Sequence, residues 1–290
     1  MSSLQTKTIS FWRYLRLMRL DKPIGIYLLL WPTLWALFLA AEGVPDLKLL
    51  LIFVLGVILM RSAGCVINDY ADRHVDKLIK RTKQRPITSG EINHKSALKL
   101  FVLLIMLAFI LVLLTNWLTI QLAMIAALLA ILYPFTKRWT HFPQFVLGLA
   151  FAMSVPMAFS ATLNTIPTTA LYVFAATVIW TVIYDTMYAM ADREEDLKIG
   201  VKSTAILFAK FDRLIIGIFQ IGLLLILIKI SDVFNLTILY DISLALVALL
   251  MIYHQYFIRH RKKSACFQIF LHNKYIGVVI FAGIALSVVL

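Results

Sequence analysis

Two acidic segments, far apart in the chain, hold residues whose types and spacing suit the binding of a metal ion. In the first, residues 68–76, three polar side chains recur at every fourth position and would share one face of a helix: Asn68, Asp72 and Asp76. In the second, residues 185–196, the steps are three and four: Asp185, Tyr188, Asp192 and Asp196. Both contain the pattern Asp-Arg-x-x-Asp, and the two copies are offset by 120 residues, from Asp72 to Asp192. An isolated acid at a helix end is usually a cap or a solvated side chain, but two matched copies favour a shared function.

The chemistry that these acids indicate is the binding of a diphosphate through Mg²⁺. Carboxylate and amide oxygens select hard cations, and Mg²⁺ binds one or two carboxylates and completes its shell with water and substrate phosphate. Basic residues follow both segments: Arg73, Lys80, Arg81, Lys83 and Arg85 after the first, and Arg193, Lys198 and Lys202 after the second. Metal and basic side chains together would neutralise a leaving diphosphate, which promotes ionisation of an allylic diphosphate.

The composition places these acids in an integral membrane protein. Of the 290 residues, 61% are hydrophobic and 15% are charged, against roughly 45–50% and about 25% in an ordinary soluble domain. The two cysteines, Cys65 in a predicted span and Cys266 in a predicted loop, indicate no disulfide framework. Because a span needs about 20 apolar residues, we predict about nine spans. They are Ile24–Ala41, Leu49–Ile67, Ala97–Leu114, Leu118–Tyr133, Phe145–Leu163, Ala170–Met190, Leu214–Ile230, Leu236–Phe257 and Tyr275–Leu290.

Lysine and arginine are distributed very unevenly over the connections between these spans. Of the 28, 25 lie in the N-terminal segment and in the connections on its side of the membrane, counting Lys99 at the adjoining end of the third span. The positive-inside rule therefore places the N-terminus and these connections in the cytoplasm, and the C-terminus outside. The same bias accounts for the net charge of +13 without a nucleic-acid partner.

The two acidic segments occupy equivalent places in this topology. They hold eight of the 15 acidic residues and lie at the cytoplasmic ends of the second and sixth spans. We therefore predict an all-α membrane protein, a single domain over residues 1–290, built as a tandem four-helix repeat plus one extra helix. An axis along the membrane normal would bring the two acidic ends to face each other.

Three cations near the segments carry weaker signals. Arg61 lies about 10 Å deeper in the second span than Asn68, on nearly the same face. An arginine inside a span is by default a functional candidate, although it also suits a structural ion pair. Lys137 and Arg138 follow Pro134 at the cytoplasmic end of the fourth span, where they could serve topology or bind an anion. A proline inside the fifth span predicts a kink there.

The two segments resemble the paired aspartate-rich signatures of the intramembrane aromatic prenyltransferases, the UbiA superfamily. They read Asn-Asp-x-x-Asp-x-x-x-Asp at 68–76 and Asp-x-x-Tyr-Ala-x-x-Asp-x-x-x-Asp at 185–196. The resemblance covers nearly the whole chain, and further runs are similar to the branch that prenylates 4-hydroxybenzoate. These runs are Leu-Asp-Lys-Pro-Ile-Gly at 20–25, Leu-Trp-Pro-Thr-Leu-Trp-Ala at 30–36, Arg-Ser-Ala-Gly-Cys-Val-Ile-Asn-Asp-Tyr-Ala-Asp-Arg at 61–73, Tyr-Pro-Phe-Thr-Lys-Arg at 133–138 and Ile-Gly-Val-Lys-Ser-Thr-Ala-Ile-Leu-Phe at 199–208.

The resemblance implies a nine-helix bundle, open sideways to lipid, in the bacterial inner membrane. It implies transfer of a polyprenyl group from a polyprenyl diphosphate to the carbon beside the hydroxyl of 4-hydroxybenzoate, a step of ubiquinone biosynthesis. The residues that it assigns to Mg²⁺ are Asn68, Asp72, Asp76, Asp192 and Asp196. Those for the diphosphate or the benzoate carboxylate are Arg73, Lys137, Arg138, Arg193 and Lys202. Those for orienting the phenol or accepting its proton are Asp185 and Tyr188. We further predict that Arg61 binds substrate and that Asp69 is catalytic.

Two other functions stay open at this point. Acids in spans and a tandem repeat also suit a cation-coupled transporter, although the acids lie at one rim rather than at the midplane. Within the superfamily, the acceptor could instead be homogentisate, a naphthoate or haem. The sequence predicts neither the length of the prenyl chain nor the oligomeric state.

Overall fold

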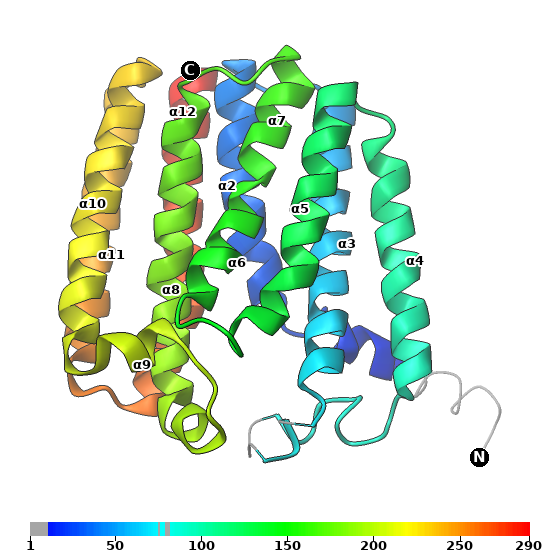
Figure 1. Ribbon diagram of the computed structural model, residues 1–290. Helices are drawn as coiled ribbons and strands as arrows, with labels where there is room; N and C mark the ends of the chain where they lie inside the picture. Colours follow the sequence, from blue (N-terminus) through cyan, green and yellow to red (C-terminus); the bar gives the residue numbers. More distant parts are fainter. Residues whose placement is uncertain (1–10, 75, 79–81) are drawn as a thin grey trace.

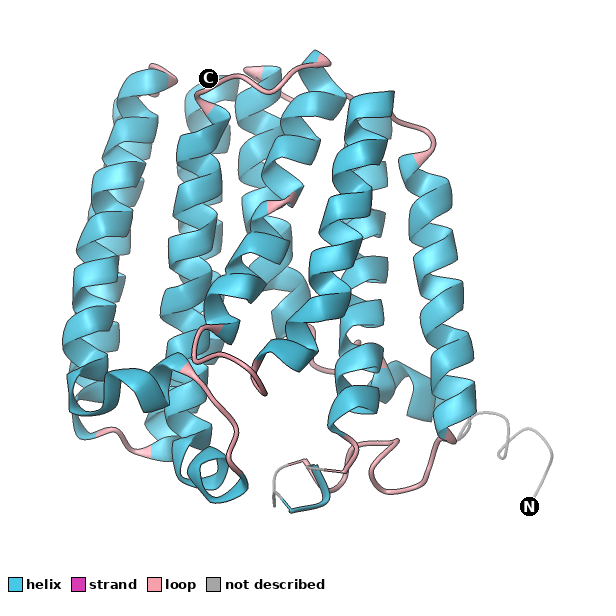
Figure 2. Ribbon diagram, viewed as in Figure 1, coloured by secondary structure: helices cyan, strands magenta, loops and turns pink. Residues whose placement is uncertain are grey.

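The computed structural model describes residues 11–74, 76–78 and 82–290, and the regular structure of this part is entirely helical (Figure 2). Nine of its helical segments are long and apolar enough to cross a membrane, which confirms the predicted fold class and number of spans for the described residues. The helices labelled in Figure 1 are α2 (Ile24–Ala41), α3 (Leu47–Asp72), α4 (His94–Val112), α5 (Trp117–Thr136), α6 (Pro143–Ala152), α7 (Ser154–Leu163), α8 (Ala170–Ile199), α9 (Thr204–Phe208), α10 (Asp212–Val233), α11 (Ile238–Phe257) and α12 (Lys263–Val289).

Two of these helices, α3 and α8, carry the acidic segments to one end of the bundle. α3 starts at a cap, where a side-chain oxygen of Asp46 accepts the N–H groups of Lys48 (2.9 Å) and Leu49 (3.2 Å). α8 runs on through the second acidic segment and stops at Gly200, whose φ of 72° is left-handed. The ends of α3 and α8 lie opposite the C-terminus (Figure 1). The predicted acidic stripe of residues 185–196 therefore lies on one continuous helix.

The predicted kink in the fifth span is present and divides it into two helices. α6 ends at Ala152 and α7 begins at Ser154, with Met153 between them. Figure 2 shows this break as a short non-helical stretch within the span. Pro156 in the first turn of α7 is the physical cause, because it lacks the N–H that would bond the carbonyl four residues earlier and its ring crowds that carbonyl.

The ninth span differs most from its prediction. The hydropathy pattern predicts a cytoplasmic loop over residues 258–274 and a span from Tyr275, but α12 already begins at Lys263. The first turns of α12 contain lysine, glutamine, histidine and asparagine between apolar residues, so their mean hydropathy is low although they are helical. The segment from Lys263 to Lys274, which was predicted to be a loop, is therefore helical and can form a rigid wall of the site.

Tight packing of α2, α8 and α12 forms the centre of the bundle. The rings of Trp35 and Trp180 lie 5.1 Å apart between centroids, and Trp35 Nε1 donates to the carbonyl of Gly277 at 3.0 Å. A Cβ atom at Gly277 would collide with Trp31 and Trp180, so glycine is required for this approach of α12. These three helices are therefore the tightly packed centre of the bundle, and α3, α4 and α5 lie beside it (Figure 1).

The neighbours of each helix agree with the predicted tandem repeat. The second and third spans, α3 and α4, pack together, as do the sixth and seventh, α8 and α10. The fourth span α5 packs on the fifth, α6 and α7, as the eighth span α11 packs on α12. This correspondence fits a four-helix unit that occurs twice, followed by one extra helix. The cytoplasmic position of the N-terminus stays a prediction.

Candidate functional site

Both acidic segments border one large cavity of about 920 Å³. α3 contributes Arg61, Asn68 and Asp69 to its wall, and α8 contributes Asp185 and Tyr188. The two segments therefore meet across one space, as the predicted repeat requires. Its volume is at the upper end of the range usual for small-molecule pockets, roughly 300–1,000 Å³.

Away from the acids, most of the wall of the cavity is apolar and combines small and large side chains. Small ones are Gly56 of α3, Ala108 of α4, and Ala123, Ala126, Ala127 and Ala130 of α5, and larger ones include Phe53 and Val57 of α3 and Phe109 and Val112 of α4. Because the lining extends over several turns, from Ile52 to Asp69 on α3 and from Thr119 to Tyr133 on α5, the cavity has an elongated apolar arm beside its polar end. This shape suits a molecule with a charged head and a long hydrocarbon tail.

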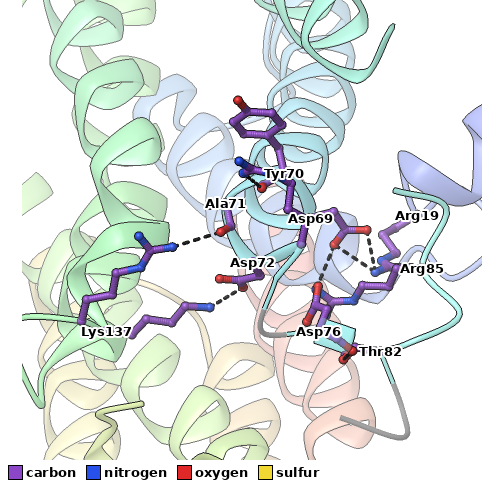
Figure 3. A network of polar contacts seen from close by, with 11 residues as sticks. Arg19, Asp69, Tyr70, Ala71, Asp72, Asp76, Thr82, Arg85 and Lys137 are labelled. Atoms are coloured by element: carbon purple, nitrogen blue, oxygen red, sulfur yellow. Dashed lines mark hydrogen bonds and ion pairs between the residues drawn. The ribbon is translucent and has the colours of Figure 1, made fainter. Parts of the chain in front are cut away.

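The acids of the first segment are held by basic side chains from three other parts of the chain (Figure 3). Arg19 Nη2 donates to both carboxylate oxygens of Asp69 at 3.2 Å. Arg85 Nη1 lies 3.0 Å from Asp69 Oδ1 and 2.8 Å from Asp76 Oδ2. On the other side of α3, Lys137 Nζ pairs with Asp72 Oδ2. The first segment is therefore a network of alternating charges rather than a solvated helix end.

Burial and charge act against each other at Asp76 and Arg85, which lie outside the spans. Burial raises the pKa of Asp76 to about 6, although Arg85 opposes this shift. At Arg85 burial lowers the pKa, but Asp69 and Asp76 outweigh it and raise the pKa above the ordinary value. Arg85 is therefore permanently charged and holds two carboxylates together.

The donor set of the first segment fits a hard cation. Oδ1 of Asp72 is buried and has no hydrogen-bond partner among the described residues, and a buried carboxylate oxygen without a partner is costly. The amide of Asn68 belongs to the same cavity wall. No three His, Cys, Asp or Glu side chains of the described ranges are grouped to hold a metal by themselves. Mg²⁺ does not need such a group, because it binds through one or two carboxylates together with water and phosphate.

The later acids of the second segment lie beyond the cavity wall. Asp192 is buried, with 8% of its surface exposed, and both Asp192 and Asp196 make polar or charged contacts. Neither belongs to the described lining of the cavity, which Asp185 and Tyr188 reach. Asp192 follows Asp185 by seven residues, about 10 Å along α8. The stripe therefore starts in the cavity and continues toward the helix end.

Arg61 lines the cavity three helical turns before the end of α3. Its guanidinium carbon is 5.7 Å from the centroid of the Phe151 ring, and its Nε is buried without a hydrogen-bond partner in the described part of the chain. A Cβ at Gly25 would collide with this guanidinium. Arg61 thus presents an incompletely satisfied positive group to the cavity.

Three further predicted cations gather where α5 ends beside α3. Arg138 Nη2 donates to the carbonyl of Ala71 at 3.0 Å, next to the pair between Lys137 and Asp72. Lys202 Nζ donates to the carbonyl of Trp139 at 3.2 Å. The end of α5, the first acidic segment and the loop after α8 therefore share one positively charged corner.

Two predicted anion-binding arginines are engaged elsewhere. Arg73 donates to the carbonyl of Tyr70 at 2.7 Å and stacks 4.4 Å from the centroid of that ring. Arg193 lies 3.5 Å from the carboxylate of Asp212 and donates to the carbonyl of Ala209 at 3.2 Å. Neither is part of the described cavity wall. The predicted cations Lys80 and Arg81 lie outside the described residues, and Lys83 and Lys198 are exposed.

Sequence reasoning missed part of the wall and two of its ion pairs. Four residues of α12 line the cavity at helical spacing: Phe267, Phe270, Leu271 and Lys274. They were missed because the segment was predicted to be a loop. Arg19 had been left without a role and Arg85 had been noted only as a nearby cation, because no spacing rule links either residue to Asp69.

The chain is similar to known proteins over most of its length. The UbiA prenyltransferase family matches residues 29–276. The chain is similar to a 4-hydroxybenzoate octaprenyltransferase of Vesicomyosocius okutanii subsp. Calyptogena okutanii, with 83% identity over 271 residues, 93% of this chain and 99% of the relative. It is also similar to a 4-hydroxybenzoate octaprenyltransferase of Vibrio cholerae, with 56% identity over 275 residues, 95% of this chain and 97% of the relative.

Solved structures share the fold at lower identity. A UbiA homologue from Aeropyrum pernix K1 superposes with a TM-score of 0.79 at 23% identity, over 90% of this chain and 97% of that one. A UbiA homologue from Archaeoglobus fulgidus bound to GPP and Mg²⁺ has a TM-score of 0.77 at 18% identity, over 96% and 99% of the two chains. These likenesses show that the arrangement of helices is common to them.

Proposed function

Because this chain belongs to the UbiA prenyltransferase family, we propose that it transfers a polyprenyl group from a polyprenyl diphosphate to 4-hydroxybenzoate. The group is joined to the ring carbon beside the hydroxyl, and diphosphate is released, which is a step of ubiquinone biosynthesis. The observation that carries this proposal is the single cavity that joins both acidic segments to an apolar arm. Because the chain belongs to a prenyltransferase family, we no longer consider a cation-coupled transporter as its function.

The diphosphate binds at the polar end of the cavity. Mg²⁺ held by Asn68, Asp72, Asp76, Asp192 and Asp196 would neutralise the diphosphate and so favour its departure. Lys137 is bonded to Asp72. If Asp72 instead held the metal, the ammonium group of Lys137 would be free to bind a phosphate oxygen. Arg138 and Lys202 stand beside it and add positive charge.

The acceptor binds deeper in the cavity, above the diphosphate. The unpaired Nε of Arg61 suits the carboxylate of 4-hydroxybenzoate, because a planar guanidinium binds a carboxylate with two hydrogen bonds. Asp185 and Tyr188 share the wall with Arg61 and are placed to orient the phenol. Asp185 or Asp69 is the carboxylate that takes the proton lost from the ring carbon.

The polyprenyl tail lies in the apolar arm between α3, α4 and α5. Small side chains such as Ala123, Ala127 and Ala130 leave room for it along α5. The same arm keeps water away from the reacting carbon, which protects a cationic carbon from capture by water.

The protein lies in the bacterial inner membrane with its acidic segments facing the cytoplasm. The support for this orientation is the placement of 25 of its 28 lysine and arginine residues on one side. Soluble 4-hydroxybenzoate would then reach the cavity from the cytoplasm, and the prenyl diphosphate from the bilayer.

The test is an assay of the purified protein in detergent with 4-hydroxybenzoate and geranyl or longer prenyl diphosphate. We expect a 3-prenyl-4-hydroxybenzoate to form with Mg²⁺ and not with EDTA, and formation to resume when Mg²⁺ is added back in excess. Product with homogentisate or a naphthoate, but none with 4-hydroxybenzoate, would overturn the acceptor and keep the reaction class. Undiminished product in EDTA would overturn the role of the metal.

A further inference from the structure

The wall that α12 contributes to the cavity is aromatic. Phe267 and Phe270 of α12 line the cavity, and so does Tyr188 of α8. The ring centroid of Tyr188 is 4.8 Å from that of Phe270 and 6.2 Å from that of Phe267. The two phenylalanine rings are 6.1 Å apart. All three side chains are only half-buried, so part of each ring surface faces the cavity.

A second aromatic layer fixes this trio from behind. Tyr184 is almost fully buried, with 1% of its surface exposed, and its ring centroid lies 6.2 Å from that of Phe270. Trp180 packs edge-on against Tyr184 at 5.3 Å. The rings at the cavity surface are therefore backed by a rigid layer and are positioned before any ligand binds.

The position of the trio relates it to the charged end of the cavity. Tyr188 follows Asp185 by one helical turn on α8, and both reach the cavity that Asn68 and Asp69 border from α3. A prenyl diphosphate with its head among these acids and its tail in the apolar arm has its first carbon between the two ends. The aromatic side chains line the same cavity and adjoin its acidic end through Tyr188, which contacts Phe270 and lies one turn from Asp185.

We propose that Phe270, together with Phe267 and Tyr188, stabilises the positive charge that develops on the allylic carbon of the prenyl donor. This inference rests on the proposed prenyl transfer. In that reaction the bond between the first carbon and the diphosphate oxygen breaks, and both electrons leave with the diphosphate. A ring carbon of the acceptor then supplies the electron pair for the new carbon–carbon bond, and the proton on that carbon passes to a carboxylate of the cavity.

The face of an aromatic ring is suited to this charge. Its quadrupole attracts a cation over the ring face within about 6 Å of the centroid. A phenylalanine ring also offers no lone pair that could capture the cation, whereas a carboxylate or a hydroxyl does. An aliphatic side chain of similar size would fill the same space without the attraction, and this difference makes the role testable.

The experiment compares variants of Phe270 in the detergent assay with geranyl diphosphate, 4-hydroxybenzoate and Mg²⁺. Phe270→Leu removes the ring, and incorporation of mono-, di- and trifluorinated phenylalanine at position 270 withdraws charge from the ring face with little change of shape. Phe281 is the matched control, because it lies on the same helix but packs on Trp31 and Phe38 outside the cavity wall. We expect kcat to fall about ten- to thirty-fold in Phe270→Leu, as loss of a desolvated cation–π contact predicts.

The fluorinated series separates catalysis from packing. Stepwise loss of kcat with each added fluorine, at nearly constant KM for both substrates, is the expected result, and Phe281→Leu should leave kcat within about twofold of the parent. A kcat that is unchanged across the series would overturn the proposal, even if Phe270→Leu proved too unstable to measure. If the parent protein formed product only with another aromatic acceptor, the proposal that 4-hydroxybenzoate is the acceptor would be wrong. The role of Phe270 could still be tested, by measuring the fluorinated series with that other acceptor.

Discussion

Asp72 and Asp192 are the residues on which the proposed diphosphate site depends most. Asp72 is 4% exposed and pairs with Lys137 through one oxygen, while its other oxygen has no partner among the described residues. Asp192 is buried further along the stripe of α8. The offset repeat of the two acids predicts that they act on the same ligand from opposite sides, so neither should be able to replace the other.

We expect Asp72→Ala and Asp192→Ala each to lower kcat on the order of a hundred-fold or more, since each removes charge stabilisation at the leaving group. Turnover by the purified variants and their yield in membranes are the measurements. Asp232→Ala is the matched control, because Asp232 is an exposed acid that pairs with Lys229 near the opposite end of the bundle. Activity like that of the parent in either variant would remove that acid from the metal site.

Arg61 can be tested through the charge of the acceptor. If its guanidinium binds the benzoate carboxylate, the parent should use 4-hydroxybenzoate far better than neutral 4-hydroxybenzamide. Arg61→Ala should lose this preference, by roughly a hundred-fold in kcat/KM as expected for a charged hydrogen-bonded pair of about 3 kcal/mol, and Arg61→Lys should keep part of it. Arg259→Ala, which changes a half-buried arginine stacked on Tyr256, is the control. An unchanged preference in Arg61→Ala would make Arg61 a structural residue.

At the scale of elements, a buried carboxylate joins α8 to α10 and to the turn before α12. Asp212 is fully buried and contacts Arg193 at 3.5 Å and Arg261 at 2.7 Å. The hydrogen bond that Arg261 donates to Asp212 is the largest of the causes that raise the pKa of Arg261 above its ordinary value. Arg193, predicted from the sequence to bind substrate, is in this structure part of a clamp that holds the end of α8.

Removal of the Asp212 carboxylate should lower the stability of the protein more than it lowers its catalytic activity. Asp212→Ala leaves two arginines without their partner, and we expect the unfolding temperature in detergent to fall by several degrees, in line with a loss of about 1–3 kcal/mol for a broken, partly exposed network. KM for prenyl diphosphate should change little in the protein that remains folded. Asp241→Ala, at an exposed acid bonded to Ser231, should leave the unfolding temperature within about a degree. A large rise of that KM in Arg193→Ala would return Arg193 to the substrate site.

The whole molecule makes a prediction about orientation. The two native cysteines, Cys65 and Cys266, are buried, so a cysteine introduced at the surface should be the main site of labelling. Lys83→Cys, on the side of the acidic segments, should react in intact cells only with a thiol reagent that crosses the membrane. Asn164→Cys, in the connection after α7, should react with one that does not. The reverse pattern would invert the proposed topology.

The features that could be predicted from the sequence are local in origin. Nine spans follow from apolar runs, the acidic stripes follow from helical spacing, and the kink at Pro156 follows from a missing N–H. None of these needs knowledge of which helices are neighbours. The family also follows from local runs, because its signatures lie within single helices and their ends.

The tertiary structure decided which side chains face the same space. It brought Arg19 and Arg85 to Asp69, occupied Arg193 with Asp212, and turned Phe267 and Phe270 toward Tyr188. The start of α12 was hidden from the sequence because its polar residues lower the mean hydropathy, while its apolar face is stabilised by contacts with α8 and α11. Such contacts join residues far apart in the chain, and the physical reason they could not be predicted is that packing energy, unlike hydropathy and periodicity, depends on the partner.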